Sequence, residues 1–147
     1  MRTLLVVFTL VAFIACKKDN NTTTVQRDYS GKWTLAQIHK MEYTLDNGDT
    51  VFTLNQRYIF TGTGFYMDFQ LDNKGGGKIL LFDDPEATAP TSFTYEAITP
   101  SYFHMDSTLC EITQLTDSSF YFNTISYDAT TFPGKIQAKQ DFFILLK

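Results

Sequence analysis

Apolar and polar side chains alternate along much of this chain, and the alternation constrains the fold more than any other feature. Over residues 31–45 the odd positions are mostly apolar and the even positions mostly polar, and residues 65–72 repeat the pattern. A helix would instead need apolar residues spaced three and four apart. The pattern therefore predicts strands with one buried face, which in the first segment carries Trp33, Leu35, Gln37, His39, Met41, Tyr43 and Leu45.

Turn signals separate the alternating segments at short intervals. Asn47-Gly48 predicts a tight hairpin because both residues tolerate positive φ, and residues 116–118 predict a second one. The aromatic content of 16%, mostly phenylalanine and tyrosine, also favours strands over helices. Together these features predict about eight to ten short strands in an all-β sandwich or barrel.

A lysine-flanked run of glycines lies between two of the predicted strands. A phosphate-binding loop needs a helix directly behind it, whereas strand patterns flank residues 73–78. We therefore predict a flexible hairpin tip at this run. Gly62 and Gly64 interrupt another alternating stretch, and they predict a bulge or sharp bend there.

The first sixteen residues have the layout of an export signal. A charged start is followed by an apolar run over residues 4–14, and the small Ala15 then precedes Cys16. The apolar run is too short to span a bilayer, which takes about 20 residues. A cysteine at this junction is typical of bacterial lipoproteins. We therefore predict that residues 1–15 are a signal peptide and that Cys16 carries the lipid.

The remainder divides into a tether and one domain. Residues 16–28 are polar and carry no strand pattern, whereas residues 29–147 have the length of one domain that can bury a core. The formal net charge of −4 argues against the clustered basic surface that nucleic acids require, so we expect no nucleic-acid partner. Lys17 replaces the aspartate that commonly retains lipoproteins in the inner membrane. We expect a lipid anchor in the outer membrane of the cell envelope, with the protein on either side of it.

Thiol and imidazole groups are few and scattered. Cys110 lies in a strand pattern with no histidine near it in sequence, so we predict a half-buried structural thiol. His39 falls on the apolar face of the first strand, and His104 lies near Asp106. A metal site needs three or four converging ligands, which this spacing does not supply, so we predict no metal.

Carboxylates give no clearer sign of catalysis. Asp83, Asp84 and Glu86 cluster in a predicted loop but lack the spacing of a calcium-binding EF-hand. The sequence contains no nucleophile elbow and no zinc-binding motif. We therefore expect a protein that is not an enzyme and carries no cofactor.

Three stretches resemble small bacterial lipocalin-like lipoproteins. Gly31 and Trp33 resemble the Gly-x-Trp opening of lipocalins and other calycins, residues 112–122 resemble the late hairpin, and residues 142–147 resemble the last strand. The resemblance covers residues 29–147. It implies a lipocalin-like, antiparallel up-and-down β-barrel of about eight to ten strands, in which Gly31 and Trp33 are structural.

The same resemblance implies a contact for the tryptophan. In the family this residue closes one end of the barrel and stacks with an arginine after the last strand. No arginine follows position 57 in this chain. The resemblance therefore implies that Lys139 or Lys147 takes its place beside Trp33.

An eight-stranded barrel either fills its interior with side chains or holds one small ligand. Our first hypothesis is a lipid-anchored domain that binds a small hydrophobic or amphipathic molecule in the barrel. Its candidate pocket residues are His39, Met41, Tyr43, Phe65, Met67, Phe69, Phe120 and Phe122.

The alternative is a barrel filled by side chains that serves as a protein–protein interaction module in an envelope assembly. Its candidate recognition loops are residues 83–91 and 127–134. An integral outer-membrane barrel is a further alternative, because alternation alone does not say which face is inside. The predicted lipid anchor is what argues against that alternative.

Overall fold

The computed structural model describes residues 28–128 and 135–147, and the regular secondary structure in these ranges consists of β-strands. The strands are β1 (Gly31–Asp46), β2 (Asp49–Ile59), β3 (Tyr66–Leu71), β4 (Gly76–Phe82), β5 (Thr91–Thr99), β6 (Tyr102–Met105), β7 (Thr108–Leu115), β8 (Ser119–Asp128) and β9 (Lys135–Leu146). All neighbouring strands pair antiparallel. The all-β prediction is confirmed, and the nine strands fall within the predicted number.

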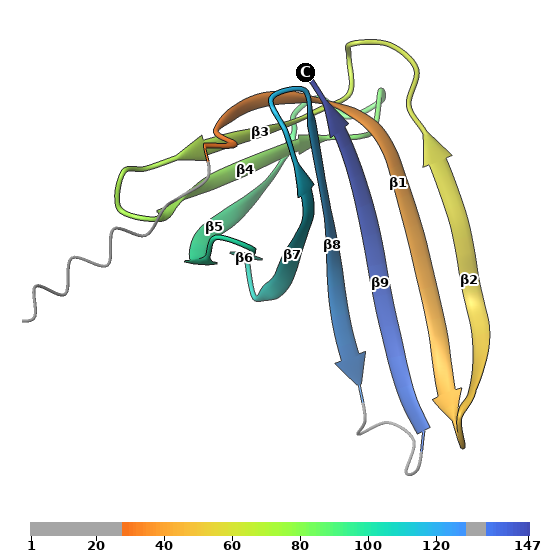
Figure 1. Ribbon diagram of the computed structural model, residues 1–147. Coiled ribbons are helices and arrows are strands. Elements are labelled where there is room, and N and C mark those ends of the chain that lie inside the picture. The colour runs from red at the N-terminus through yellow and green to blue at the C-terminus, as the bar shows by residue number, and fades with distance from the viewer. Residues whose placement is uncertain (1–27, 129–134) are drawn as a thin grey trace, which may run out of the picture.

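Eight of the strands close into a barrel. Strands β3 to β9 follow one another in order, and β1 completes the circle by pairing with β3 on one side and β9 on the other. Only the first residues of β1 contact β3, from Gly31 to Thr34. The rest of that edge, from Gln37 onward, pairs with β2, which lies outside the closed barrel (Figure 1). The predicted up-and-down barrel is therefore confirmed, with one extra strand.

Four strands continue beyond the barrel as a sheet, which we call the extension. It consists of residues 37–46 of β1, all of β2, residues 123–128 of β8 and residues 135–142 of β9. Figure 1 shows these long strands running well past the short β5, β6 and β7. β2 forms one edge of the extension. Among the described residues, no strand pairs with the edge of β2 that faces away from β1.

A β-bulge in β1 marks the passage from barrel to extension. Leu35 pairs with Leu145 and Ile38 pairs with Phe143. Between these two pairs, β1 advances by three residues and β9 by only two. Because directly paired residues share a face, the extra residue transfers every later odd position of β1 to the opposite face. The backbone of Ala36 also accepts the hydrogen bond from Phe60, where β2 ends beside this bulge.

The bulge corrects one sequence-based prediction. The alternation predicted a single buried face from Trp33 to Leu45, and this is wrong beyond Leu35. Trp33 and Leu35 are buried, but the next core residue is the even-numbered Ile38. His39, Met41 and Tyr43 lie on the outer face instead, and all three are only partly buried.

The predicted turns are mostly confirmed. Asn47 and Gly48 join β1 to β2 with φ of 52° and 94°, as a tight hairpin requires. The glycine run is more constrained than predicted, because its last members begin β4 rather than form a free tip. A Cβ on Gly77 would lie 2.4 Å from the carbonyl oxygen of Gln70, so this position requires glycine.

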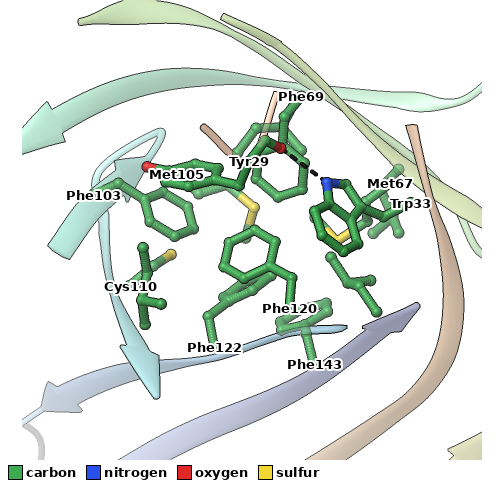
Figure 2. Close-up of a cluster of buried hydrophobic side chains, with 14 of the residues drawn as sticks. Tyr29, Trp33, Met67, Phe69, Phe103, Met105, Cys110, Phe120, Phe122 and Phe143 are labelled. Carbon is green, nitrogen blue, oxygen red and sulfur yellow. Dashed lines mark hydrogen bonds between the residues drawn. The ribbon is translucent and has the colours of Figure 1, made fainter. Parts of the chain in front are cut away.

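Aromatic side chains fill the barrel. Figure 2 shows the rings of Phe69, Phe103, Phe120 and Phe122 grouped around Tyr29, which enters from the segment before β1. Each of these four phenylalanines is at most 1% exposed, and Tyr29 is 3% exposed. The core is therefore built from both the strands and the residues that lead into them.

Trp33 closes this core near the C-terminal end of β9. Its indole Nε1 donates a hydrogen bond of 2.9 Å to the carbonyl oxygen of Tyr29 (Figure 2). The Nζ atom of Lys147 lies 4.5 Å from the centre of the Trp33 ring, a cation–π contact. Of the two lysines that the resemblance implied, Lys147 takes the position, whereas Lys139 pairs with Glu42 at 3.2 Å.

Several predictions concern residues that lie outside the described ranges. These are the signal peptide over residues 1–15, lipidation at Cys16, most of the tether and residues 129–134 of one predicted recognition loop. In the ranges that are described, no helix has the length and apolar character needed to cross a bilayer.

Candidate binding surfaces

Most of the predicted pocket residues form the packed core. Met67, Phe69, Phe120 and Phe122 are fully buried together, and Phe65 packs against them from the edge. The ring centroids of Phe69 and Phe120 lie 5.2 Å apart, and those of Phe120 and Phe122 lie 5.3 Å apart. At these distances the rings contact one another and occupy the space between the strands.

Tyr29 also fills part of the barrel interior, in contact with rings from several strands. Its ring centroid lies 4.9 Å from that of Phe120 and 5.7 Å from that of Phe69. Its hydroxyl shares a hydrogen bond with the hydroxyl of Tyr95. Burial is the main cause that raises the pKa of Tyr29, and the bond to Tyr95 adds to it. The tyrosine therefore stays neutral and occupies space that an interior ligand would need.

Cys110 belongs to the same core. It is fully buried, so the predicted half-buried strand thiol is more enclosed than expected. Its Sγ donates a weak hydrogen bond to the carbonyl oxygen of Thr108 at 3.7 Å. Burial raises the pKa of Cys110 to about 12. The thiol is therefore protonated at neutral pH, and the thiolate needed for nucleophilic attack is scarce.

The remaining predicted pocket residues lie on the outer face of the extension. The Nε2 atom of His39 lies 2.7 Å from Oδ1 of Asn55, in hydrogen-bond contact across to β2. The ring of Tyr43 packs beside that of Phe52 at 5.6 Å. Met41 lies between His39 and Tyr43 on the same face. The fold therefore separates His39, Met41 and Tyr43 from the five aromatic and methionine residues of the core.

These residues belong to a larger surface, which we call the outer apolar face. The strand register brings together apolar side chains from all four strands of the extension. They are Met41, Tyr43 and Leu45 of β1, Phe52 of β2, Ile125 and Tyr127 of β8, and Ile136, Ala138 and Phe142 of β9. Phe52 is 51% exposed and Tyr127 is 63% exposed, so large rings face solvent here. The apolar surface is interrupted by Gln140 of β9, which lies between Met41 and Ile125 in the register. Large exposed apolar groups gathered on one face are typical of binding surfaces.

The opposite face of the extension continues the interior wall of the barrel, yet it is polar. Lys135 and Lys139 of β9 pair with Asp46 and Glu42 of β1 at 2.8 and 3.2 Å. A shallow hollow of about 210 Å³ lies on this face, with threonine, serine, glutamine and charged side chains in its lining. We call this surface the inner polar face.

Asp141 lies where the inner polar face meets the core. Its Oδ1 is buried without a hydrogen-bond partner, and its cross-strand neighbours are Lys40 and Thr124. Burial raises the pKa of Asp141, although Lys40 and Lys139 act in the opposite direction. This carboxylate is therefore less stable in its charged form than an exposed one.

A second hollow, which we call the wall hollow, lies on the outer wall where β6, β7 and β8 adjoin. It has a volume of about 250 Å³ and is lined by Tyr102, Leu109, Glu111, Asn123, Ile125 and Tyr127. The hydroxyl of Tyr102 donates to Oε1 of Glu111 at 3.1 Å, and this bond raises the pKa of Tyr102. Asn123 is 3% exposed, and its Oδ1 has no hydrogen-bond partner.

Several other polar groups considered from sequence have structural partners. Asp106 accepts hydrogen bonds from the backbone and hydroxyl of Thr94, and His104 lies 3.7 Å from Glu96. Asp84 accepts from the backbone of Glu86 in a local turn. Over residues 28–128 and 135–147, no three His, Cys, Asp or Glu side chains lie together as a metal site.

Sequence reasoning missed the wall hollow and the central position of Tyr29. Asn123, Ile125 and Tyr127 do alternate in the sequence, and that signal identifies one face of a strand. It does not say that β6 and β7 lie beside that face. No protein family model, curated protein or solved structure matches this chain. The functional conclusion therefore rests on the sequence and the surfaces described above.

Proposed function

We propose that this chain is a non-enzymatic, lipid-anchored protein of the outer membrane that binds a protein partner through the outer apolar face. One observation carries the proposal. The barrel interior is occupied by side chains, whereas large apolar groups such as Phe52 and Tyr127 are exposed on the extension. Burying such groups against a partner is favourable at roughly 25 cal/mol per Å² of apolar surface.

The lipid anchor supports this role by holding the domain at a membrane. Residues 16–28 form a short polar connection to the barrel, which fits a tether that presents the domain close to the surface. A lipoprotein cysteine carries more than one acyl chain, which suffices for stable anchoring. Cys16→Ala should move the protein from the membrane fraction to the soluble fraction. Unchanged sedimentation with membranes contradicts the anchor.

The strand β2 offers a matched pair of variants to test the docking surface. Phe52 and Val51 are adjacent and similarly exposed, at 51% and 57%. Their register partners are Tyr43 and Thr44, so Phe52 lies on the outer apolar face and Val51 on the inner polar face. Any general effect of removing exposed apolar surface should therefore appear in both variants.

The experiment compares Phe52→Ser with Val51→Ser in whole cells. A photoreactive amino acid placed at Tyr43 should crosslink one dominant protein partner in the otherwise unchanged chain. Phe52→Ser should reduce that adduct by about tenfold, because an aromatic side chain is lost from the contact, and Val51→Ser should leave it unchanged. Equal effects of the two variants, or only scattered weak adducts, contradict the proposal.

A second function is supported by the wall hollow. We propose that a small amphipathic molecule binds there rather than inside the barrel. A hollow of about 250 Å³ that combines apolar walls with a few polar groups is suited to a small ligand. Uptake of a small amphipathic probe, mapped by amide chemical shifts to β6, β7 and β8, is expected. Shifts confined to core residues, or none, contradict it.

A further inference from the structure

Five strands lie side by side on the outer wall, in the order β7, β8, β9, β1 and β2. Figure 1 shows the last four of them running together along the extension. One row of directly paired residues crosses all five strands, and its members are Glu111, Asn123, Phe142, His39 and Arg57. Directly paired residues share a face of the sheet, so the whole row lies on the outer wall. It carries an acidic and a basic side chain at opposite ends, each two strands away from Phe142.

The two charges at the ends of this row have no ion-pair partner in the described part of the chain. Arg57 is exposed. Glu111 is partly exposed, and its carboxylate accepts the hydroxyl of Tyr102 at 3.1 Å. A partner surface that carries the same two charges in the reverse order would therefore be complementary to both of them.

A second copy of this chain offers that reversed row. A half-turn about an axis that runs along β9, between two facing sheets, exchanges the two sides of the row. Glu111 of each copy then faces Arg57 of the other, and Phe142 faces its counterpart. A half-turn about an axis across the strands would instead place each strand over its own counterpart, which brings like charges together. Charge complementarity therefore favours the axis along β9.

The neighbouring rows fit the same half-turn. Ile125 and Met41 lie on either side of Gln140, so Ile125 of one copy faces Met41 of the other. Tyr127 and Tyr43 lie on either side of β9 in the next row and face each other in the same way. Gln140 faces its counterpart, and its side-chain amide can both donate and accept a hydrogen bond. The one polar interruption of the outer apolar face is thus matched by itself.

The wall hollow lies where the exposed ring of Phe52 arrives from the second copy. Phe52 pairs with Tyr43 and lies two strands from β9, so the half-turn places its ring beyond Tyr127 of the facing copy. Tyr127 and Leu109 line the wall hollow there, which has a volume of about 250 Å³. A protruding ring on one side of the face therefore meets a hollow on the other. A small ligand in the wall hollow and this ring would exclude each other.

We propose that the outer apolar face docks a second copy of this chain, in a two-fold dimer whose axis runs along β9. The inference rests on the protein-partner function proposed above and names that partner. Strands of the two copies run in the same direction, which is the aligned arrangement that facing sheets commonly adopt, within about 30°. The homodimer buries apolar groups from both copies in one interface, as such interfaces typically do.

This axis also suits two lipid-anchored copies. Because the axis runs along the strands, both barrels lie at the same end of the dimer. The predicted anchor precedes Tyr29, which lies in the barrel core, so both tethers begin at that end. Both lipids can therefore reach one membrane, and holding both copies at one surface raises their effective concentration.

Cysteine crosslinking in whole cells tests the position of the axis. Two copies with different peptide tags are expressed together, and each carries Gln140→Cys. A short bismaleimide should join them into an adduct that carries both tags, because Gln140 lies on the axis. Val51→Cys is the control, since Val51 is 57% exposed but lies on the inner polar face, and it should give no such adduct. The chain without an added cysteine gives the background.

Exchanging the two charges tests the pairing. With Gln140→Cys as the reporter, Arg57→Glu in both copies should reduce the adduct at least about fivefold, because like charges then face each other. Glu111→Arg in both copies should do the same. A cell that expresses one copy with Arg57→Glu and the other with Glu111→Arg should recover the adduct, since every facing pair is again opposite in charge. Recovery also shows that both variants fold.

Photocrosslinking from Tyr43 separates this inference from the function on which it rests. An adduct that carries both tags is expected. A dominant adduct with a different protein overturns the dimer but retains the docking surface, whereas only scattered weak adducts overturn both. Equal crosslinking of Gln140→Cys and Val51→Cys, or no recovery in the mixed charge variants, overturns the arrangement about β9.

Discussion

The barrel and the extension are built from the same strands, yet they present opposite faces to solvent. In the barrel, the inward side chains of β1 and β9 are apolar, as Leu35 and Leu145 illustrate. In the extension, the face that continues this wall carries ion pairs, and the apolar side chains lie on the outside. An unbroken alternation along a strand therefore does not guarantee a single buried face.

The two regions also differ in what holds them together. Side chains in the barrel pack against others from across the closed sheet, so each substitution there disturbs many neighbours. Side chains on the extension contact mainly their cross-strand neighbours. Substitutions in the barrel should consequently affect stability, whereas those on the outer apolar face should affect binding.

The largest predicted effect is the loss of a central core ring. Phe120→Ala should lower the free energy of unfolding by about 3–5 kcal/mol, because it leaves a cavity among contacting aromatic rings. Phe52→Ala on the extension should change it by less than about 0.5 kcal/mol. Urea denaturation measures both. Similar losses would remove the distinction between the two regions.

A smaller loss is predicted for the glycine at the start of β4. Gly77→Ala should cost about 2 kcal/mol or more, since the new Cβ would contact the backbone of Gln70 and Leu71. Gly48→Ala is the comparison, because Gly48 has positive φ but open space around its Cα. Thermal unfolding should show the greater loss for Gly77→Ala. The reverse order would contradict the close approach of β3 and β4.

The cation–π contact between Lys147 and Trp33 should contribute less to stability than either the core ring or the glycine. Lys147→Gln should cost about 0.5–1 kcal/mol, because the charge above the Trp33 ring is lost. Lys139→Gln removes an exposed ion pair on the extension and should cost less than about 0.5 kcal/mol. Tryptophan fluorescence should respond to the first substitution alone. A fluorescence response to Lys139→Gln alone would contradict the contact between Lys147 and Trp33.

The smallest predicted effect depends on pH. Burial raises the pKa of Asp141 in the folded state. The stability that the protonated side chain contributes is therefore fully present below the unfolded-state pKa of about 3.9, and it is lost as the pH rises through the folded-state pKa. Asparagine does not ionise, so Asp141→Asn removes this pH-dependent loss of stability. The stability of the variant relative to the original chain should therefore increase between about pH 4 and about pH 7. A constant difference across this range would show that Asp141 is not perturbed.

The sequence predicts the strands well because these depend on local patterns, whereas the closed barrel, as opposed to a sandwich, is implied by the resemblance to lipocalin-like proteins. The alternation around Phe69 and the Asn47-Gly48 turn identify elements that the structure contains. The resemblance to lipocalin-like proteins, rather than spacing, implies that Lys139 or Lys147 lies beside Trp33, and the structure shows Lys147 there.

The candidate binding surfaces are harder to predict because they depend on one inserted residue and on distant pairings. Nothing in the residues around Ala36 distinguishes the bulge from a continuous strand, so His39, Met41 and Tyr43 were expected on the wrong face. The wall hollow requires Glu111 and Asn123 to meet across β7 and β8. Tyr29 precedes the first strand, and its place at the centre of the core follows from tertiary packing alone.

A paired substitution in β1 tests the face switch most directly. Leu35 and Met41 belong to the same alternating set, but the structure places Leu35 in the core and Met41 on the outer apolar face. In urea denaturation of the full chain, Leu35→Ala should lower the free energy of unfolding by about 2–5 kcal/mol, and Met41→Ala by less than about 1 kcal/mol. Equal losses of several kcal/mol would contradict the switch and place both side chains inside one continuous buried face.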